Sequence, residues 1–144
     1  MMVLVVGAGR VGSAVAKSSL AAGHTVSVLD EDPLSHERLD AGQRTSWEDA
    51  GGRFTVGTAI ELDALLAAGV EEADMFIAAT RGDNTNILVA QIAQKRFGVP
   101  RVIVRVLDPA RSDWYAKQGL HTVCAVKLGI AMLEQAVTEA AATS

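Results

Sequence analysis

Short apolar runs alternate with longer amphipathic segments along most of the chain. The short runs are rich in β-branched and aliphatic residues, and the longer segments repeat apolar residues at helical spacing. This alternation is typical of repeated strand–helix–strand units, in which helices cover both faces of a parallel sheet. We therefore expect a doubly wound α/β fold, with strands at 3–6, 25–29, 54–56, 75–79, 102–106 and 121–124, and helices at about 10–22, 33–41, 61–68, 83–97, 109–118 and 126–140.

The composition suits a sheet of this kind in one domain. Of the 144 residues, 49% are hydrophobic but only 4% are aromatic, so Val, Leu, Ile and Ala must form the core, as in parallel sheets covered by helices. A chain of this length buries about one such core, and we expect a single domain over 1–144. The formal net charge of -4 disfavours nucleic acid and anionic lipid as partners, because both bind basic surfaces.

The N-terminus and the cysteine content indicate a compartment. The sequence begins Met1-Met2-Val3-Leu4, without the basic flank and long apolar run of a signal peptide. Its longest apolar runs fall far below the roughly 20 residues that a membrane span needs. The single cysteine, Cys124, forms no internal disulfide. We expect a cytoplasmic protein with no direct membrane insertion.

A glycine motif joins the first expected strand to the first expected helix. Gly7, Gly9 and Gly12 form a GxGxxG pattern directly after 3–6. Gly7 permits a tight turn, Gly9 lets the backbone approach a pyrophosphate, and Gly12 lets the helix pack close to the strand. Phosphates at this point would lie on the amides and the positive dipole end of the helix. In this context the motif is typical of Rossmann-type nucleotide-binding domains.

Acidic residues follow the second expected strand. Asp30 ends that strand, where a carboxylate can accept hydrogen bonds from both ribose hydroxyls. Glu31 and Asp32 come next, so a ribose 2′-phosphate would meet three carboxylates and no nearby arginine, which disfavours NADP(H). NAD(H) and ATP or ADP remain as ligands. Arg10, inside the glycine motif, is either a cation for their phosphates or a solvated residue of the first helical turn.

The sequence offers no group that suits catalysis or metal binding. His24 and His121 precede strands, away from the carboxyl ends where such folds bind ligands, and His36 is expected on the exposed side of a helix. No pair of histidines has metal-ligand spacing. Cys124 lies in an apolar run, which is typical of an inert buried thiol. A dehydrogenase also needs a second substrate pocket, usually on another domain. We expect neither a catalytic residue nor a metal site.

Two features bear on packing. Trp47 lies in a polar stretch, 43–53, and is expected in an exposed loop, whereas Trp114 and Tyr115 are expected to pack on the sheet or on a neighbouring chain. The last expected helix carries an apolar stripe that must be covered, by a second copy of the chain or in part by its own sheet. The stripe comprises Leu128, Met132, Leu133, Ala136 and Val137.

Further segments follow the glycine motif in a fixed order. They are Asp30-Glu31-Asp32-Pro33, Val56-Gly57-Thr58-Ala59, Leu65-Leu66-Ala67-Ala68-Gly69-Val70, Ala73-Asp74, Ala78-Ala79-Thr80, Asp83-Asn84 with Asn86, Val104-Arg105-Val106 and Asp108-Pro109, then Tyr115 and Gly119. With them, nearly the whole chain resembles the N-terminal nucleotide-binding domain (TrkA-N) of the regulator-of-potassium-conductance family. Members are cytoplasmic subunits of Trk and Ktr potassium uptake systems.

The resemblance implies a function and a set of partners. In this family the sheet binds NAD(H), ATP or ADP, two such domains pair, and the ligand state alters the shape of a ring that gates a membrane partner. It therefore implies a non-enzymatic regulator, homodimeric or in a higher ring. Its partner would be a membrane potassium transporter or channel subunit, which would hold it at the inner face of the cell membrane.

The resemblance also implies roles for single residues. Arg10 and Arg105 would reach the phosphates, Asp30 the ribose, and Thr58 and Ala59 the adenine edge, with residues 78–80 along the flank of the ligand. The ligand residues expected from motif and resemblance together are Gly7, Ala8, Gly9, Arg10, Val11, Gly12, Asp30, Glu31, Thr58, Ala59, Ala78, Ala79, Thr80 and Arg105.

The chain departs from the family pattern in three places. The family often has Asp where Thr58 stands. Adenine recognition in this chain is therefore expected to be weaker or to depend on backbone groups. Some members carry a Pro-Glu pair that helps to bind a divalent cation between subunits, and Ala125-Val126 stand there in this chain, so we expect no such metal site. The smaller C-terminal ligand-binding domain of the family does not follow within the 144 residues. We therefore expect either the N-terminal portion of a longer protein or a naturally short regulator.

Two other functions stay open. One is a small NAD-dependent oxidoreductase, or a fragment of one. The other is a dimerising Rossmann module whose ligand site has been lost, since a fold alone does not establish a function.

Overall fold

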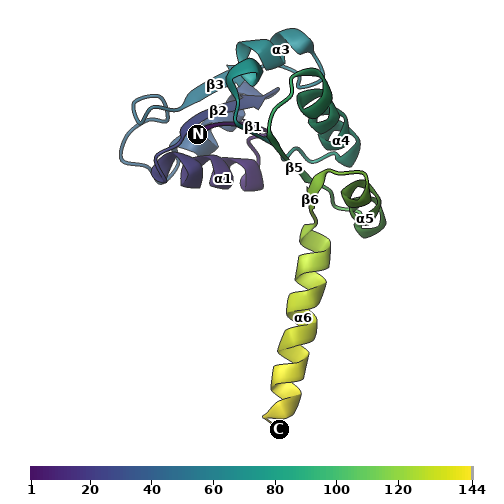
Figure 1. Ribbon diagram of the computed structural model, residues 1–144. Coiled ribbons are helices and arrows are strands. Elements are labelled where there is room, and N and C mark those ends of the chain that lie inside the picture. The colour runs from purple at the N-terminus through teal and green to yellow at the C-terminus, as the bar shows by residue number, and fades with distance from the viewer. Residues whose placement is uncertain (144) are drawn as a thin grey trace.

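The computed structural model, which describes residues 1–143, contains one six-stranded sheet in which all neighbouring strands are parallel (Figure 1). The spatial order is β3-β2-β1-β4-β5-β6. The expected α/β fold and its strands are confirmed. The chain order reverses on either side of β1, and the carboxyl ends of β1 and β4 form the crevice in which such sheets bind ligands. The strands are β1 (Met2–Val6), β2 (Thr25–Asp30), β3 (Arg53–Val56), β4 (Met75–Ala78), β5 (Arg101–Arg105) and β6 (His121–Val123).

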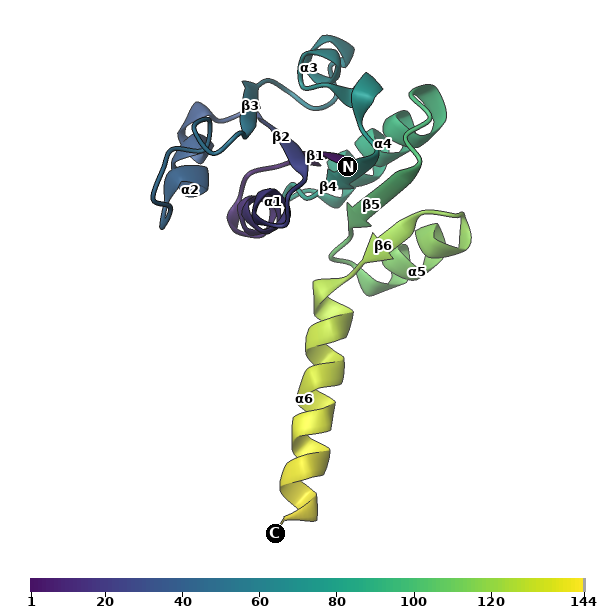
Figure 2. The ribbon, with the colours of Figure 1, turned by 60° about the vertical axis from the view of Figure 1, so that its left-hand side comes forward.

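Helices cover both faces of this sheet. Figures 1 and 2 show α3 and α4 on one side and α1 with α2 on the other. Two expected helices are interrupted: 33–41 begins as a 3-10 turn, η1 (Pro33–Ser35), and 83–97 ends in a π-helical turn, η3 (Ile92–Arg96). The other elements are α1 (Arg10–Ala21), α2 (His36–Asp40), α3 (Leu62–Ala67), η2 (Val70–Glu72), α4 (Asp83–Gln91), α5 (Pro109–Lys117) and α6 (Ala125–Ala142).

The core consists of two layers, one on each face of the sheet. Val3 and Val5 of β1 point into the layer under α1 and α2, whereas Leu4 and Val6 point into the layer under α3 and α4. All four side chains are buried. A strand that is buried on both faces must be apolar throughout, which explains why β1 shows no alternation with polar residues.

Trp47 lies in the core, so its expected exposure is wrong. The side chain is 2% exposed and packs in the layer under α1. Its backbone N–H donates to Asp40 Oδ1 at 2.8 Å, and its indole Nε1–H donates to the Arg53 carbonyl at 2.9 Å. Gly52 supports the ring, because a Cβ at that position would lie 2.1 Å from it. Trp47 thus fixes a loop whose polar neighbours had suggested solvent exposure.

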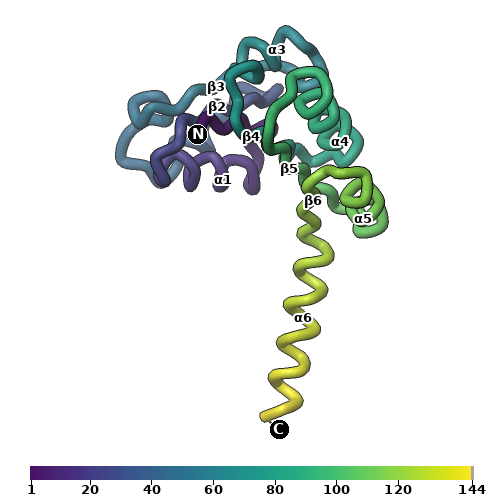
Figure 3. Tube along the Cα trace, in the orientation of Figure 1, coloured from purple at the N-terminus to yellow at the C-terminus, as the bar shows by residue number. Residues whose placement is uncertain are grey.

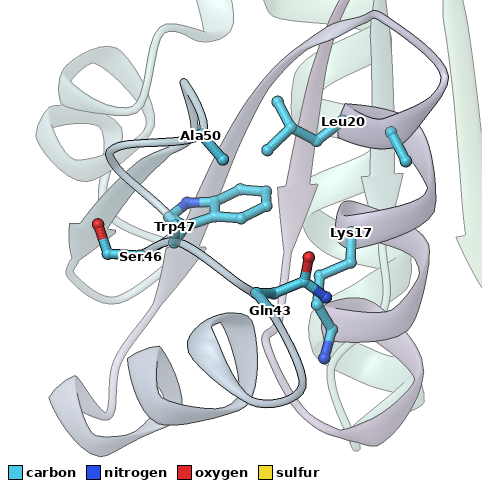
Figure 4. Close-up of a pocket in the computed structure, with 7 residues that line it drawn as sticks. Lys17, Leu20, Gln43, Ser46, Trp47 and Ala50 are labelled. Carbon is cyan, nitrogen blue, oxygen red and sulfur yellow. The ribbon is translucent and has the colours of Figure 1, made fainter.

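The loop of Trp47 and helix α1 enclose a small cavity of about 160 Å³. Figure 4 shows Trp47 and Leu20 on its walls and Lys17 at its edge. The Lys17 ammonium is already engaged, since it donates to the carbonyls of Arg38 and Ala41 at 2.8 and 3.3 Å. A volume of this size is below the 300 Å³ or so that ligand pockets usually offer. The cavity is too small for a nucleotide.

Helix α6 extends away from the sheet domain (Figures 1 and 3). Every one of its residues is exposed or half-buried, and Leu133 and Val137 are 70% and 69% exposed. The possibility that part of its apolar stripe docks on the chain's own sheet is therefore wrong. Among residues 1–143, no helix combines the length and the apolar character needed to cross a membrane.

Two contacts hold the first turn of α6 to the domain. The Cys124 thiol donates to the Leu107 carbonyl at 3.5 Å and accepts from the Lys127 backbone N–H at 3.4 Å. The Lys127 ammonium forms an ion pair with Asp113 of α5. The hydrogen bond from Lys127 to the Asp113 carboxylate, assisted by its negative charge, raises the pKa of Lys127 above its ordinary value. These contacts thus tie the first turn of α6 to the domain, and most of the helix beyond that turn is solvent-exposed.

The two aromatic residues of α5 behave differently. Tyr115 is half-buried and packs against the core, as expected, whereas Trp114 is 56% exposed. Their rings meet edge to face with centroids 4.8 Å apart. Together with Ala110 and Arg111 they line an open hollow of about 380 Å³. This surface lies on α5, outside the glycine turn.

Candidate functional site

The glycine motif forms a tight turn between β1 and α1. Gly7 has φ +101°, and a Cβ there would lie 2.7 Å from the Ala79 carbonyl oxygen. At Gly12 a Cβ would lie only 1.7 Å from the Gly7 carbonyl oxygen. Gly9 differs, because nothing lies within 4 Å of the Cβ position. Gly7 and Gly12 therefore serve the packing of the turn, and Gly9 leaves open space beside it.

Helix α1 presents its N-terminus to this open space. Gly9 is the N-cap, no side chain caps the helix, and no acidic residue lies in the first turn. Arg10 is exposed and is the first residue of the helix. A cation at this end opposes the helix dipole, and a bound anion would relieve both the unfavourable charge and the uncapped amides.

Asp30 joins the end of β2 to the glycine turn. Its Oδ2 accepts a hydrogen bond from the Ala8 backbone N–H at 2.6 Å. Its Oδ1 accepts from the Asp32 backbone N–H at 2.8 Å and from Ser35 Oγ at 3.2 Å. A carboxylate offers about four lone-pair positions, so these three bonds orient the group and leave capacity for a further donor. Sequence patterns placed Asp30 at this edge but did not indicate Ala8 or Ser35 as its partners.

An arginine lies closer to Asp30 than the sequence suggested. Arg38 Nη1 donates to Ser35 Oγ at 3.2 Å and to the Ala8 carbonyl oxygen at 3.4 Å. Ser35 in turn binds Asp30, so the guanidinium adjoins the carboxylate through one hydroxyl. The premise that no arginine lies near this end of β2 is therefore wrong. It failed because η1 and α2 fold residue 38 back over the turn.

The loop after β3 contributes Thr58 and Ala59. Gly57 N–H donates to the Asp30 carbonyl at 3.0 Å, which places this loop beside the end of β2. Thr58 is half-buried, while the Ala59 side chain belongs to the core. Val56 and Ile60 are 53% and 51% exposed on either side of them. These two exposed apolar side chains were not among the expected site residues.

The end of β4 lies beside the glycine turn. Ala79 N–H donates to the Val6 carbonyl at 2.8 Å. Ala78 and Ala79 are buried, so they offer backbone groups rather than side chains, and Thr80 is half-buried. The backbone of residues 78–80 thus lies along the edge of the crevice, next to the glycine turn.

Asn86 connects the ends of β4 and β5. It is 1% exposed, and its Oδ1 accepts from the N–H and the Oγ1 of Thr80 at 2.9 and 2.6 Å. Its Nδ2 donates to the carbonyls of Thr80 and Arg105, each at 3.0 Å. The Arg105 guanidinium closes the arrangement by donating to the Thr80 carbonyl at 3.2 Å. Thr80 and Arg105, both expected site residues, are therefore held by a buried amide outside the expected set.

Asp83 forms a second connection between the same two strand ends. Its carboxylate oxygens accept from the backbone N–H groups of Leu107 and Asp108 at 2.8 and 3.1 Å. Leu107 also accepts the Cys124 thiol, so the loop after β5 touches both the crevice edge and the start of α6.

The histidines and the cysteine lie in other surroundings. The His24 ring contacts the N-terminal amine at 3.3 Å, and His121 begins β6. Both are at the amino ends of strands. His36 lies between Asp40 and Glu48, and Cys124 is 8% exposed at the start of α6.

Comparisons with known proteins agree with the fold. The family model described as the TrkA-N domain matches residues 3–126. The "Trk system potassium uptake protein TrkA" of Streptomyces coelicolor is 42% identical over 127 residues, which are 88% of this chain and 54% of the relative. The chain thus spans about half the length of this relative.

Two solved structures share the fold. The TrkA-N domain of the Escherichia coli inner membrane protein ybaL superposes with a TM-score of 0.76 at 20% identity, covering 93% of this chain and 95% of that one. GsuK bound to ADP superposes with a TM-score of 0.73 at 20% identity, covering 92% of this chain and 32% of that one. With the family match over most of its length, the chain belongs to the TrkA-N domain family.

Proposed function

We propose that this chain binds an adenine nucleotide, NAD(H) or ATP/ADP, along the carboxyl edge of its sheet and thereby regulates a potassium uptake system. The observation that carries the proposal is the hydrogen bond from Ala8 N–H to Asp30. It joins a glycine turn of the kind that binds phosphates to a strand-end carboxylate of the kind that binds ribose, at the point where the strand order reverses. The named function of the Streptomyces coelicolor relative and the ADP complex of GsuK support it.

The phosphate half of the site consists of the turn and two arginines. The phosphates lie over Gly9, where the backbone is open, and accept hydrogen bonds from the uncapped amides of α1. Arg10 and Arg105 supply positive charge from α1 and from the end of β5. Thr80 lies beside the ligand, and Asn86 fixes the backbone N–H and carbonyl of Thr80.

The ribose and adenine lie over β2 and β3. Asp30 accepts hydrogen bonds from the ribose hydroxyls with its remaining lone pairs, and Glu31 lies next to it. The adenine edge meets the backbone of Thr58 and Ala59. The exposed side chains of Val56 and Ile60 give its ring an apolar contact.

Regulation requires a route from this site to a partner. Arg105, Leu107 and Cys124 form a continuous path from the crevice to the start of α6, through the end of β5 and the Cys124–Leu107 hydrogen bond. The exposed apolar residues of α6 then pair with a second copy of the chain, in a homodimer or a larger ring. The assembly acts on a membrane potassium transporter or channel subunit from the cytoplasmic face. A nucleotide that binds one of two arrangements of the assembly more tightly than the other would shift the assembly toward that arrangement.

We infer that the chain performs no hydride transfer. Arginines, hydroxyls, amides and the Asp30 carboxylate lie beside the crevice; that carboxylate already accepts three hydrogen bonds, and the histidines belong to other surroundings. Substrate-dependent oxidation of NADH that a single substitution in this chain abolishes would favour an oxidoreductase instead.

Titration calorimetry on the purified chain tests the nucleotide site. Wild-type protein should bind ADP and NADH, and Asp30→Ala should weaken NADH by about 1 to 3 kcal/mol, the range for losing hydrogen bonds to a charged group. Asp63→Ala removes an exposed carboxylate at the start of α3 and should leave both affinities unchanged. Absence of binding by folded wild-type protein would indicate that the ligand site has been lost.

A further inference from the structure

One histidine of the chain lies between two carboxylates, on the side of the sheet that α1 and α2 cover. His36 Nδ1 is 3.2 Å from Asp40 Oδ2, and His36 Nε2 is 2.5 Å from Glu48 Oε1. One donor atom from each of the three residues lies within 4.8 Å of the other two. We propose that His36, Asp40 and Glu48 bind a divalent transition-metal ion of the zinc class.

Two carboxylates gather around one imidazole. His36 Nε2 is hydrogen-bonded to Glu48 Oε1, and Asp40 Oδ2 lies 3.2 Å from Nδ1. A neutral imidazole ligates a metal through one ring nitrogen, and a divalent cation bound there would cancel the charges of both carboxylates.

The chain holds the three donors in place by contacts that are independent of any ion. His36 and Asp40 are four residues apart on α2, the spacing that puts two side chains on one face of a helix. The second oxygen of Asp40 accepts a hydrogen bond from Trp47 N–H at 2.8 Å. The Trp47 ring is buried, and because Glu48 follows Trp47 in the chain, this burial fixes the backbone next to Glu48. The Phe54 ring meets the His36 ring edge to face at 5.2 Å, which limits the ring's orientation.

Partial exposure leaves room for the ion to enter. The side chains of His36, Asp40 and Glu48 are 28%, 41% and 52% exposed. Water can therefore complete the coordination shell. Ligand atoms around tetrahedral zinc lie roughly 3.3 Å apart, given bonds of about 2.0–2.1 Å. Glu48, the most exposed of the three, has the side-chain freedom to approach that separation while the Trp47 N–H keeps Asp40 in place.

The donor types select the class of metal. An imidazole nitrogen with two carboxylate oxygens suits Zn²⁺ and neighbouring transition metals, whereas Mg²⁺ and Ca²⁺ take oxygen ligands. Sequence patterns did not indicate this site, because the expectation of no metal rested on the spacing of the histidines with one another and on Ala125-Val126. Only the fold of 43–52 around Trp47 brings Glu48 to α2.

The test is a calorimetric titration of the nucleotide-free, 144-residue chain with zinc chloride. Wild-type protein should take up one Zn²⁺ per chain, and an excess of Mg²⁺ should not compete. Glu48→Gln should weaken Zn²⁺ binding by at least about tenfold, the lower limit even for losing a residue that only supports a ligand. Glu37→Gln is the matched control, an exposed carboxylate on the same helix, and should leave the affinity unchanged.

Cobalt gives a second readout that reports on the ligands themselves. The visible absorption of Co²⁺ bound to wild-type protein should change in Glu48→Gln and disappear in His36→Gln, with folding of each variant checked by circular dichroism. Zn²⁺ affinity that is equal in wild type and Glu48→Gln would overturn the proposal, as would failure of folded wild-type protein to bind Zn²⁺ saturably.

Discussion

The carboxylate of Asp30 accepts a hydrogen bond from the Ala8 backbone N–H at 2.6 Å, across the gap between the end of β2 and the glycine turn. This bond joins the two parts of the proposed nucleotide site, the glycine turn for the phosphates and Asp30 for the ribose. Replacing Asp30 should therefore alter the conformation of the glycine turn, and a substitution in the turn should alter the position of the Asp30 carboxylate.

The preference between NADH and NADPH depends on Asp30 and Arg38. NADPH should bind wild-type protein at least about tenfold more weakly, because its 2′-phosphate loses the ribose contact and meets Asp30, Glu31 and Asp32. Asp30→Ser should narrow this preference, since it removes one repelling charge and leaves the Arg38 guanidinium nearby. The double variant with Arg38→Ala should lose that gain. Calorimetry with both dinucleotides measures the ratios. Equal affinities in the wild type would mean that the ribose lies elsewhere.

The glycines of the turn differ in their roles, and alanine substitutions separate them. Gly12→Ala should lower the free energy of unfolding by about 1 to 3 kcal/mol, because its Cβ would overlap the Gly7 carbonyl, and this outweighs the roughly 1 kcal/mol that alanine gains in a helix. Gly9→Ala should change stability by no more than about 0.5 kcal/mol, since its Cβ enters open space. The same Cβ obstructs the phosphates, so ADP affinity should fall.

Urea denaturation and ADP titration of the two variants check this pair. A destabilised Gly9→Ala, or a Gly9→Ala variant with wild-type affinity for ADP, would contradict the assignment of open space beside the turn to the ligand.

Asn86 holds two expected ligand residues, and its replacement should affect stability and binding together. Asn86→Asp loses both donations from Nδ2 and puts a carboxylate against the carbonyls of Thr80 and Arg105. We expect a loss of about 1 to 3 kcal/mol in the free energy of unfolding, with weaker ADP binding. Asn84→Asp is the control, because it is exposed and keeps the oxygen that accepts from Arg111. Similar behaviour of the two variants would exclude the proposed role of Asn86.

Helix α6 should mediate self-association. Wild-type protein should sediment as a dimer at about tens of micromolar, because exposed apolar residues along α6 lack cover within residues 1–143. Leu133→Asp puts a charge on the most exposed of them and should yield monomers, whereas Gln135→Asp on a polar position of the same helix should not. A wild-type monomer at these concentrations, unchanged by nucleotide, would contradict the dimer.

Local patterns predicted the sheet because its four central strands are short and mostly apolar, and helical segments separate the strands along the chain. The glycine motif also predicted its own turn, since Gly7 and Gly12 have steric roles that depend only on neighbouring elements. The orientation of α6 was not predictable in the same way. An apolar stripe shows that a helix needs a partner but does not say whether that partner is its own sheet.

The parts of the sites that sequence patterns missed come from contacts distant in the chain. Trp47 lies among polar residues, and its burial depends on Gly52 and α1. Arg38 returns to the glycine turn only because a 3-10 turn precedes α2. Asn86 was visible as a motif residue, but its role emerges from bonds to two different strand ends.

The most direct test of the nucleotide site is an NMR titration of the isotope-labelled chain with ADP, which reports on each backbone amide. The largest chemical-shift changes are expected at Gly9, Arg10, Val11 and Gly12, with smaller ones at Thr80 and Thr58. The same amides should respond weakly or not at all in Gly9→Ala. Unchanged signals at saturating ADP, or shifts confined to α5 and α6, would contradict it.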